Sequence, residues 1–308
     1  MKKILFFITA VSLGFMSCTK EKTDYEAEIE TVVTEHYEFK EAVSVSRQPY
    51  IISVEALNGT FYAGYNEIRI KVTDTRTSEN IQASALTFLP ILNLTDGSVG
   101  SGPHRYMPEY RADSSFFSGY AVFTNESGEK GTWDLYMGFQ IGDDTYRIKQ
   151  AVSVQKQLNK NLNMTAFTGK DGEQYYIALV SPQKPKIAEN ELVAGIYTFN
   201  KPSGPPSGVF PDPSQFSYSQ VNDYTLQLDP RMPEPSMGNH SSPNNMDLKQ
   251  RSDGLYYGVV NYTMTGNWTL NFIMLNKNGQ ILKGREVSTD FTPGIEGEKS
   301  DLFIDILF

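Results

Sequence analysis

The sequence predicts an all-β protein made of two tandem antiparallel β-sandwiches. Short segments such as PYIISVEAL and EIRIKVTD alternate apolar and polar residues, as half-buried strands do. Turn residues separate these segments at regular intervals, and no long helical period occurs. Residues 86–137 and 226–274 share one pattern, and AGYNEIRIKVTD around Asn66 matches AENELVAGIYTF around Asn190. The chain is therefore predicted to contain an internal duplication.

Two landmarks recur at nearly equal spacing in the shared pattern. Each copy has a Pro-broken loop, a His, two adjacent aromatic residues, a Gly, a strand, a hairpin and a Trp. His104 precedes His240 by 136 residues, and Trp133 precedes Trp268 by 135. The two His are therefore expected to be equivalent. Both Trp are expected to anchor a core, with the indole N–H bonded at its rim.

The first residues, MKKILFFITAVSLGFMSC, predict an exported protein. Two Lys precede an apolar run that is too short to span a bilayer, which is typical of a cleaved secretory signal. Residues 1–17 resemble a bacterial lipoprotein signal, with Cys18 as the lipidated residue. The alternative is an ordinary signal peptide with an incidental Cys. The lipoprotein interpretation predicts a membrane anchor and a place in the bacterial outer membrane or at the cell surface.

Charge and composition define the remaining organisation. Residues 18–45 are highly charged and predict a tether, followed by a first sandwich over 46–157 and a second over 165–308. The net charge is −9 with a pI near 5.0 and no basic run, so nucleic acid is not an expected partner, whereas an envelope protein is. Cys18 is the only Cys, so its lipidation would exclude disulfide and thiolate chemistry.

A cluster of soft ligands marks the second copy. Met232, Met237, His240 and Met246 lie within fifteen residues, with Pro residues between them, and Met264 could complete the set. Thioether and imidazole groups suit Cu(I), and thioethers bind without deprotonation. The pattern therefore predicts a copper site. The alternative is that the Met residues fill gaps in a core and that the His is a solvated turn residue.

The first copy offers fewer candidates. His104 and Met107 are two ligands at most, so a site there is expected to be degenerate. The sequence has no nucleophile elbow, no H-E-x-x-H and no phosphate-binding Gly loop, so the protein is not expected to be an enzyme. A glycosidase with two carboxylates on distant strands would leave no local motif, and that alternative stays open.

The order of these motifs resembles a known family. AGYNEIRIKVTD, an A-x-A-x-x-F segment, a Pro/Met/His loop and a G-Y…M-x-G-x-W-x-L strand pair are similar to the YtkA-like (FixH/CopC-neighbouring) domain. The second copy matches more fully, through RMPEPSMGNH and YYGVVNYTMTGNW, while the first has no Met opposite Met232 or Met237. The resemblance implies small immunoglobulin-like sandwiches in bacterial envelopes, often near copper handling or cytochrome oxidase maturation. Copper reservoir, sensor or delivery partner is the expected function.

A second functional class remains open. A structural or recognition module could bind a protein or a glycan without metal through the Pro-rich loop at 201–218. This loop is expected to be an exposed, semi-rigid excursion. Phe210, Phe216, Tyr218 and Tyr224 would supply its contact surface.

Overall fold

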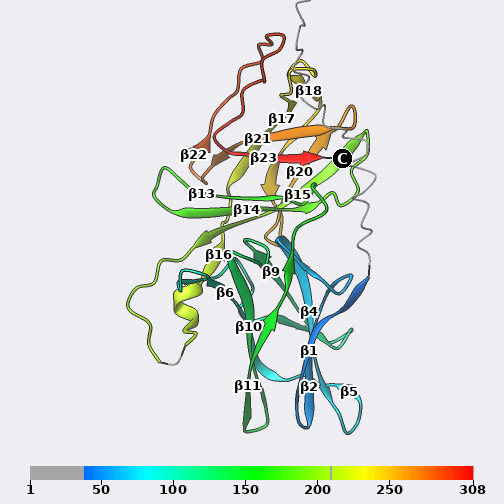
Figure 1. The fold of residues 1–308 in the computed structure, drawn as a ribbon, viewed down its shortest axis with the longest axis vertical. Coiled ribbons are helices and arrows are strands. Elements are labelled where there is room, and N and C mark those ends of the chain that lie inside the picture. Colours follow the sequence, from blue (N-terminus) through cyan, green and yellow to red (C-terminus); the bar gives the residue numbers. More distant parts are fainter. Residues whose placement is uncertain (1–37, 209, 308) are drawn as a thin grey trace, which may run out of the picture.

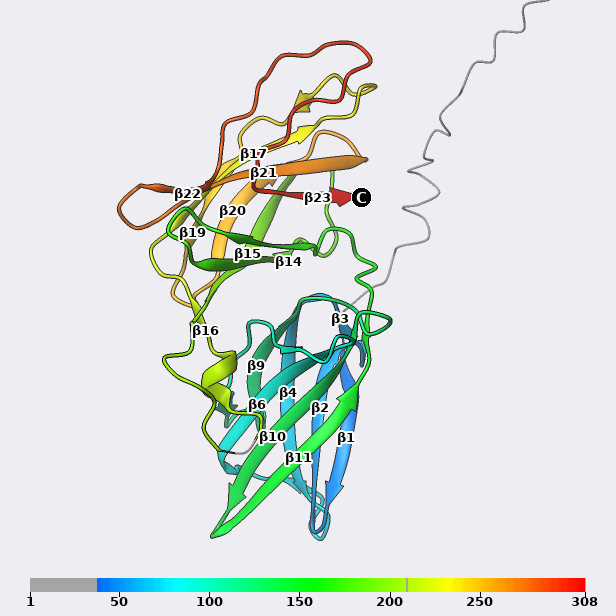
Figure 2. The same ribbon diagram turned by 60° about the vertical axis from the view of Figure 1, so that its left-hand side comes forward.

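The computed structural model describes residues 38–208 and 210–307, and there the protein is all-β apart from one short 3₁₀ helix. The predicted signal, Cys18 and most of the tether lie outside the described residues. No helix among the described residues is long and apolar enough to cross a membrane. The chain forms two β-rich halves, one above the other in Figures 1 and 2.

The N-terminal half has two antiparallel sheets that face each other across one core. The first sheet is β1 (Phe39–Arg47), β2 (Tyr50–Leu57), β4 (Gly64–Asp74), β9 (Phe116–Phe123) and β8 (Glu109–Arg111), with β5 (Glu79–Asn80) beside β4. The second is β11 (Asp144–Val152), β10 (Gly131–Ile141), β6 (Ser84–Leu94) and β7 (Val99–Gly100). A short parallel pair, β3 (Phe61–Tyr62) with β12 (Val154–Gln155), closes one end. Ile52, Phe88 and Trp133 are fully buried between the sheets.

The C-terminal half forms one continuous sheet that folds back around its own core. Its order is β13 (Met164–Thr168), β14 (Gln174–Ser181), β15 (Glu189–Phe199), β20 (Tyr256–Asn261), β19 (Met246–Gln250), β17 (Thr225–Met232), β21 (Asn267–Leu275) and β22 (Ile281–Gly284). Beside this path lie β16 (Tyr218–Gln220), β18 (His240–Ser241) and β23 (Phe303–Leu307), and the 3₁₀ helix η1 covers Pro213–Phe216. The fully buried Trp268, Phe272 and Tyr256 fill the core.

The strand order repeats in the two halves, as the duplication predicts. The run β1-β2-β4-β9-β8 corresponds to β13-β14-β15-β20-β19, and β11-β10-β6-β7 corresponds to β22-β21-β17-β18. Asn66 bonds both backbone groups of the residue four places earlier and the carbonyl two places earlier. Asn190 makes the same three bonds in the other half. The two halves therefore share local contacts as well as topology.

Both Trp are the core anchors that the sequence predicts. Trp133 and Trp268 have no exposed surface. The indole N–H of Trp133 donates to the carbonyl of Asn125 over 2.9 Å, and that of Trp268 donates to the carbonyl of Met264 over 3.1 Å. Each ring thus fills a core while its one polar group is bonded at the rim.

The expected equivalence of the two His is wrong. Pro90 and Pro230 occupy matching positions, because each pairs with the residue two places after the Trp of its half. The residue two places after Pro90 pairs with Gly100, whereas the residue two places after Pro230 pairs with His240. His240 therefore corresponds to Gly100, and His104 instead makes an isolated bridge to β9. A length difference of five residues between these positions and the Trp explains the misleading spacing.

The 200–217 segment between β15 and β16 is exposed over residues 201–208, as predicted, but its last part packs against the N-terminal half. In Figures 1 and 2 it runs from the C-terminal half down beside the N-terminal half. Phe216 is 8% exposed and packs with Leu89 and Ile91 on the outer face of β6. Just beyond it, the hydroxyl of Tyr218 donates to the carbonyl of Ser101 over 2.9 Å. Apolar burial against the first half fixes the segment.

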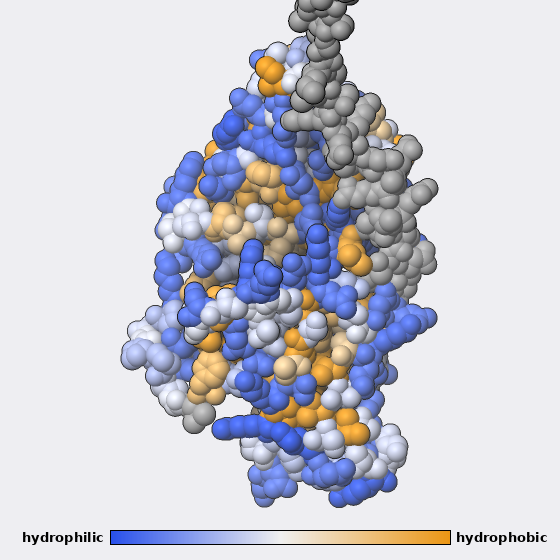
Figure 3. Space-filling model, in the orientation of Figure 1, coloured by the Kyte–Doolittle hydropathy of each residue, from blue (hydrophilic) through white to orange (hydrophobic). Residues whose placement is uncertain are grey.

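Tyrosine rings join the halves at a second place. The ring of Tyr120 lies 5.8 Å from that of Tyr65 and 5.2 Å from that of Tyr197, in stacked arrangements. Val122 and Tyr176 belong to the same buried cluster. Burial raises the pKa of Tyr120 to about 12, so its phenol stays neutral at ordinary pH. The phenols at this contact between the halves are therefore uncharged, whereas hydrophilic residues cover much of the outer surface (Figure 3).

Candidate functional site

The short strand β18, which begins with the predicted ligand His240, lies at the end of the C-terminal half that is remote from the N-terminal half (Figure 1). β17 ends at Met232, a turn follows, and β18 begins at His240, which pairs with Met232. Met232 is 1% exposed and belongs to the core around Trp268. Its terminal methyl lies against Gly266, where an added Cβ would approach it to 2.7 Å. The thioether of Met232 therefore faces the protein interior.

His240 is held in a fixed orientation beside that core. Its Nε2 atom lies 2.9 Å from the hydroxyl oxygen of Thr263, and its ring centre lies 6.2 Å from that of Trp268. The contact with Thr263 leaves Nδ1 as the ring nitrogen that a metal could take. Met237 and Met264 are half-buried and pack against the same core. Thioethers thus pack on the core that contains Trp268, and the imidazole of His240 lies beside its ring.

Met246 lies apart from the other predicted ligands. It begins β19 and is 61% exposed. Its neighbour Asp247 accepts a hydrogen bond from the backbone N–H of Leu228, which stands four residues before Met232 on β17. Four residues along a strand span about 13 Å. The four ligands predicted from sequence are therefore not gathered at one point.

The first-half candidates do not resemble a metal site. His104 is 6% exposed, and its Nδ1 lies 2.8 Å from the carbonyl oxygen of Gly102. Burial lowers the pKa of His104 to about 4, partly opposed by this bond. Met107 is 63% exposed. His104 is thus a neutral, structural residue. Among the described residues, no group of three or more His, Cys, Asp or Glu could hold a metal ion.

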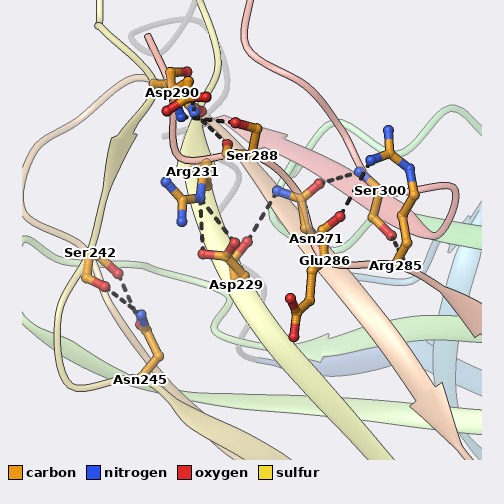
Figure 4. Close-up of polar contacts among 11 residues, drawn as sticks. Asp229, Arg231, Ser242, Asn245, Asn271, Arg285, Glu286, Ser288, Asp290 and Ser300 are labelled. Atoms are coloured by element: carbon orange, nitrogen blue, oxygen red, sulfur yellow. Dashed lines mark hydrogen bonds and ion pairs between the residues drawn. The ribbon is translucent and has the colours of Figure 1, made fainter. Parts of the chain in front are cut away.

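A polar network fastens the 285–300 loop over the outer face of β17 and β21 (Figure 4). The side-chain amide of Asn271 donates to the carbonyl of Asp229, and its oxygen accepts from the backbone N–H of Ser300. The carboxylate of Asp229 accepts from Nε of Arg231 over 2.9 Å. Asn239, in the turn before His240, donates to the carbonyl of Ser288. These contacts hold the turn that carries the Met and His residues.

Sequence reasoning missed a groove of about 810 Å³. Its floor is the outer face of β6, β10 and β11, including Thr87, Tyr136 and Gly138, and its wall is the 200–217 segment. The ring of Phe210 from that segment meets the ring of Tyr136 edge-on at 5.7 Å. Both halves of the protein therefore build this groove.

Charged side chains border the groove. Arg47 and Arg147 are exposed and line it, together with Lys149. The ammonium of Lys149 lies 3.1 Å from the carboxylate of Asp134 and 5.6 Å from the ring centre of Tyr136. One signal in the sequence could have indicated this site. In TWDLYMGF, Tyr136 alternates with the core-facing residues, which puts a large ring on the outside of the sandwich.

Comparisons with known proteins show no family. No family model matches the chain, and no curated protein matches it. A DUF4785 family protein from Legionella pneumophila is 11% identical with a TM-score of 0.25, over 76% of this chain and 55% of that one, so this chain spans about half its length. A conserved domain protein from Bacillus anthracis is 11% identical with a TM-score of 0.26, over 88% of this chain and 90% of that one.

Proposed function

We propose that this protein is a non-enzymatic recognition module of the bacterial envelope that binds a partner in the groove between β6, β10, β11 and the 200–217 segment. The proposal includes a lipid anchor on Cys18 at the outer membrane or cell surface. It also assigns each half to the immunoglobulin-like sandwiches, in tandem, as the YtkA-like resemblance implies. The groove itself is the observation that supports the function.

The groove has the properties of a binding site. Its volume of about 810 Å³ lies within the range of pockets that hold small ligands. Aromatic rings line it with a few polar groups, which is the usual make-up of such sites. Its wall does not depend on a free loop, because Phe216 anchors the 200–217 segment in the contact between the halves. A pre-formed wall lowers the entropy cost of binding.

An array experiment tests this function. Wild-type protein is screened against immobilised glycans and peptides beside Thr87→Trp, which places a large ring on the groove floor. Thr132→Trp is the matched control, because Thr132 is an exposed position on β10 outside the groove. Binding that Thr87→Trp loses and Thr132→Trp keeps is the expected result. If the two variants behave alike, or if no ligand on the array binds, the proposal is wrong.

The Met and His residues of the C-terminal half support a second candidate, the binding of copper or a similar soft ion. The pairing of Met232 with His240 beside Trp268 is the observation that favours it. Met237 is the third ligand in this proposal, and Met264 replaces Met246, which lies apart. Thioether and imidazole donors fit Cu(I). The protein would then serve as a reservoir, sensor or delivery partner for copper.

A Cu(I) competition titration with a colorimetric chelator tests the second candidate. The double variant Met237→Leu/His240→Asn is expected to lose the one-to-one binding of the wild type. Met246→Leu is the matched control and is expected to bind like wild type. If wild type does not compete with the chelator, or if the double variant competes equally well, copper binding at this place is excluded.

A further inference from the structure

The groove carries positive charge on an acidic protein. The chain as a whole has a net charge of −9, yet Arg47, Arg147 and Lys149 line the groove. Lys149 is paired with Asp134, whereas no ion pair to Arg47 or Arg147 occurs among the described residues. These two guanidinium groups are therefore available to an anionic ligand, and guanidinium groups bind carboxylates and sulfates through paired hydrogen bonds.

The one carboxylate in the lining is already engaged. Asp212 accepts hydrogen bonds from the backbone N–H groups of Ser207 and Ser214, over 2.7 and 2.9 Å. These contacts lower the pKa of Asp212 to about 2, so its charge is stabilised by the 200–217 segment itself. Asp212 therefore stays ionised on the wall, and among the described residues no ion pair joins it to the cations on the opposite side.

The floor of the groove favours a ligand that is recognised by side chains. β10 is paired with β6 on one side and β11 on the other, and β6 is paired with β10 and β7. The backbone groups of β10 are therefore used on both sides, whereas β7 covers β6 only at Leu92 and Asn93. An extended peptide would find main-chain partners only at the outer edges of this floor, along β11 and the first part of β6. Sugar rings instead pack on aromatic rings, and Tyr136 and Phe210 offer such surfaces.

We infer that the groove binds an anionic glycan, a sugar chain that carries carboxylate or sulfate groups. This inference rests on the proposed recognition function and names its ligand class. Tyr136 and Phe210 contact the sugar rings, and Arg47 and Arg147 bind the acidic groups.

Calorimetric titration of the full chain tests this inference. The probes are a galacturonate hexamer, the same hexamer with every carboxylate methyl-esterified, a sulfated dextran oligomer and a poly-glutamate peptide. At least one anionic sugar probe is expected to bind, more weakly as salt is raised. Arg47→Gln/Arg147→Gln should weaken it by about tenfold or more. Lys130→Gln/Lys277→Gln changes two exposed cations outside the groove and should have no effect.

The remaining outcomes overturn the inference in distinguishable ways. If the esterified hexamer binds as tightly as the acid, or if only the peptide binds, the ligand class is wrong while recognition in the groove survives. If the anionic sugars bind but the arginine variant and Thr87→Trp both bind them like wild type, the groove is not the site and the proposed function fails too. If no sugar probe binds, the glycan inference is wrong, and the array screen decides the function separately.

Discussion

The duplicated asparagines allow one stability experiment to be made twice in the same molecule. Asn66 and Asn190 are both buried, and each makes three hydrogen bonds to backbone groups. The bond lengths run from 2.7 to 3.0 Å at Asn66 and from 2.7 to 2.9 Å at Asn190. Replacing either residue by Ala leaves one N–H and two carbonyl groups without these partners.

The expected loss of stability follows from the number of bonds. One hydrogen bond contributes about 1 kcal/mol net, so each Ala variant should lower the free energy of unfolding by about 3 kcal/mol. Because the contacts match, Asn66→Ala and Asn190→Ala should cost the same within about 1 kcal/mol. Asn278→Ala is the control, since Asn278 is exposed in a turn, and its effect should stay within about 0.5 kcal/mol.

Urea denaturation followed by circular dichroism measures these differences. The apolar contact between the halves predicts that they unfold in one transition, so either variant should shift the same midpoint without changing the slope. The two sites are not equivalent if one Ala variant lowers the free energy of unfolding by about 3 kcal/mol and the other by less than about 1 kcal/mol. Two separate transitions would refute the coupling of the halves.

Three further predictions concern a buried histidine, the anchor of the 200–217 segment and a glycine beside the C-terminal core. The pKa of His104 is about 4 in the folded protein and 6.5 in the unfolded chain, so the free energy of unfolding should fall by about 3 kcal/mol as the pH drops from 6.5 to 4. His104→Gln should remove this part of the pH dependence in urea titrations. An equal dependence in the variant contradicts the prediction. Phe216→Ala should cost about 3 kcal/mol and speed amide exchange in the 200–217 segment; unchanged exchange would show that the segment does not depend on this ring. Gly266 has a φ of +131°, and a Cβ there would meet the terminal methyl of Met232. Gly266→Ala should therefore lower the free energy of unfolding by about 2 kcal/mol. An unaltered melting temperature would exclude that contact.

The fold was predictable because strand alternation and the Trp positions depend on local chemistry. Alternating segments became strands, and both Trp became core anchors. The match of Asn66 with Asn190 was visible in sequence because the same local bonds require the same residue. The equivalence of His104 with His240 failed, because equal spacing does not reveal a length difference between strands that pair across a sheet.

The site was less predictable, because closeness in sequence differs from closeness in an extended chain. Met246 is only six residues from His240, but an extended chain advances by about 3.3 Å with each residue, so nearby residues in sequence can lie far apart. The Pro-rich composition of the 200–217 segment predicted a stiff loop and contained no information on where Phe216 would dock. The groove joins residues from Arg47 to Pro213, so the outward ring of Tyr136 in TWDLYMGF could indicate only a part of its floor.

β19 joins the two layers of the C-terminal half by strand pairing, which the N-terminal half does not do in the same way. It pairs with β20 on one side and with β17 on the other, so a regular ladder crosses the corner between the two layers. In the N-terminal half, β8 pairs with β9, and the crossing is made by the segment around His104, where Tyr106 accepts one bond from the N–H of Phe88 over 2.8 Å. Under tension applied through the chain, the N-terminal corner should therefore yield first. Acid that charges the buried His104 would lower the force required.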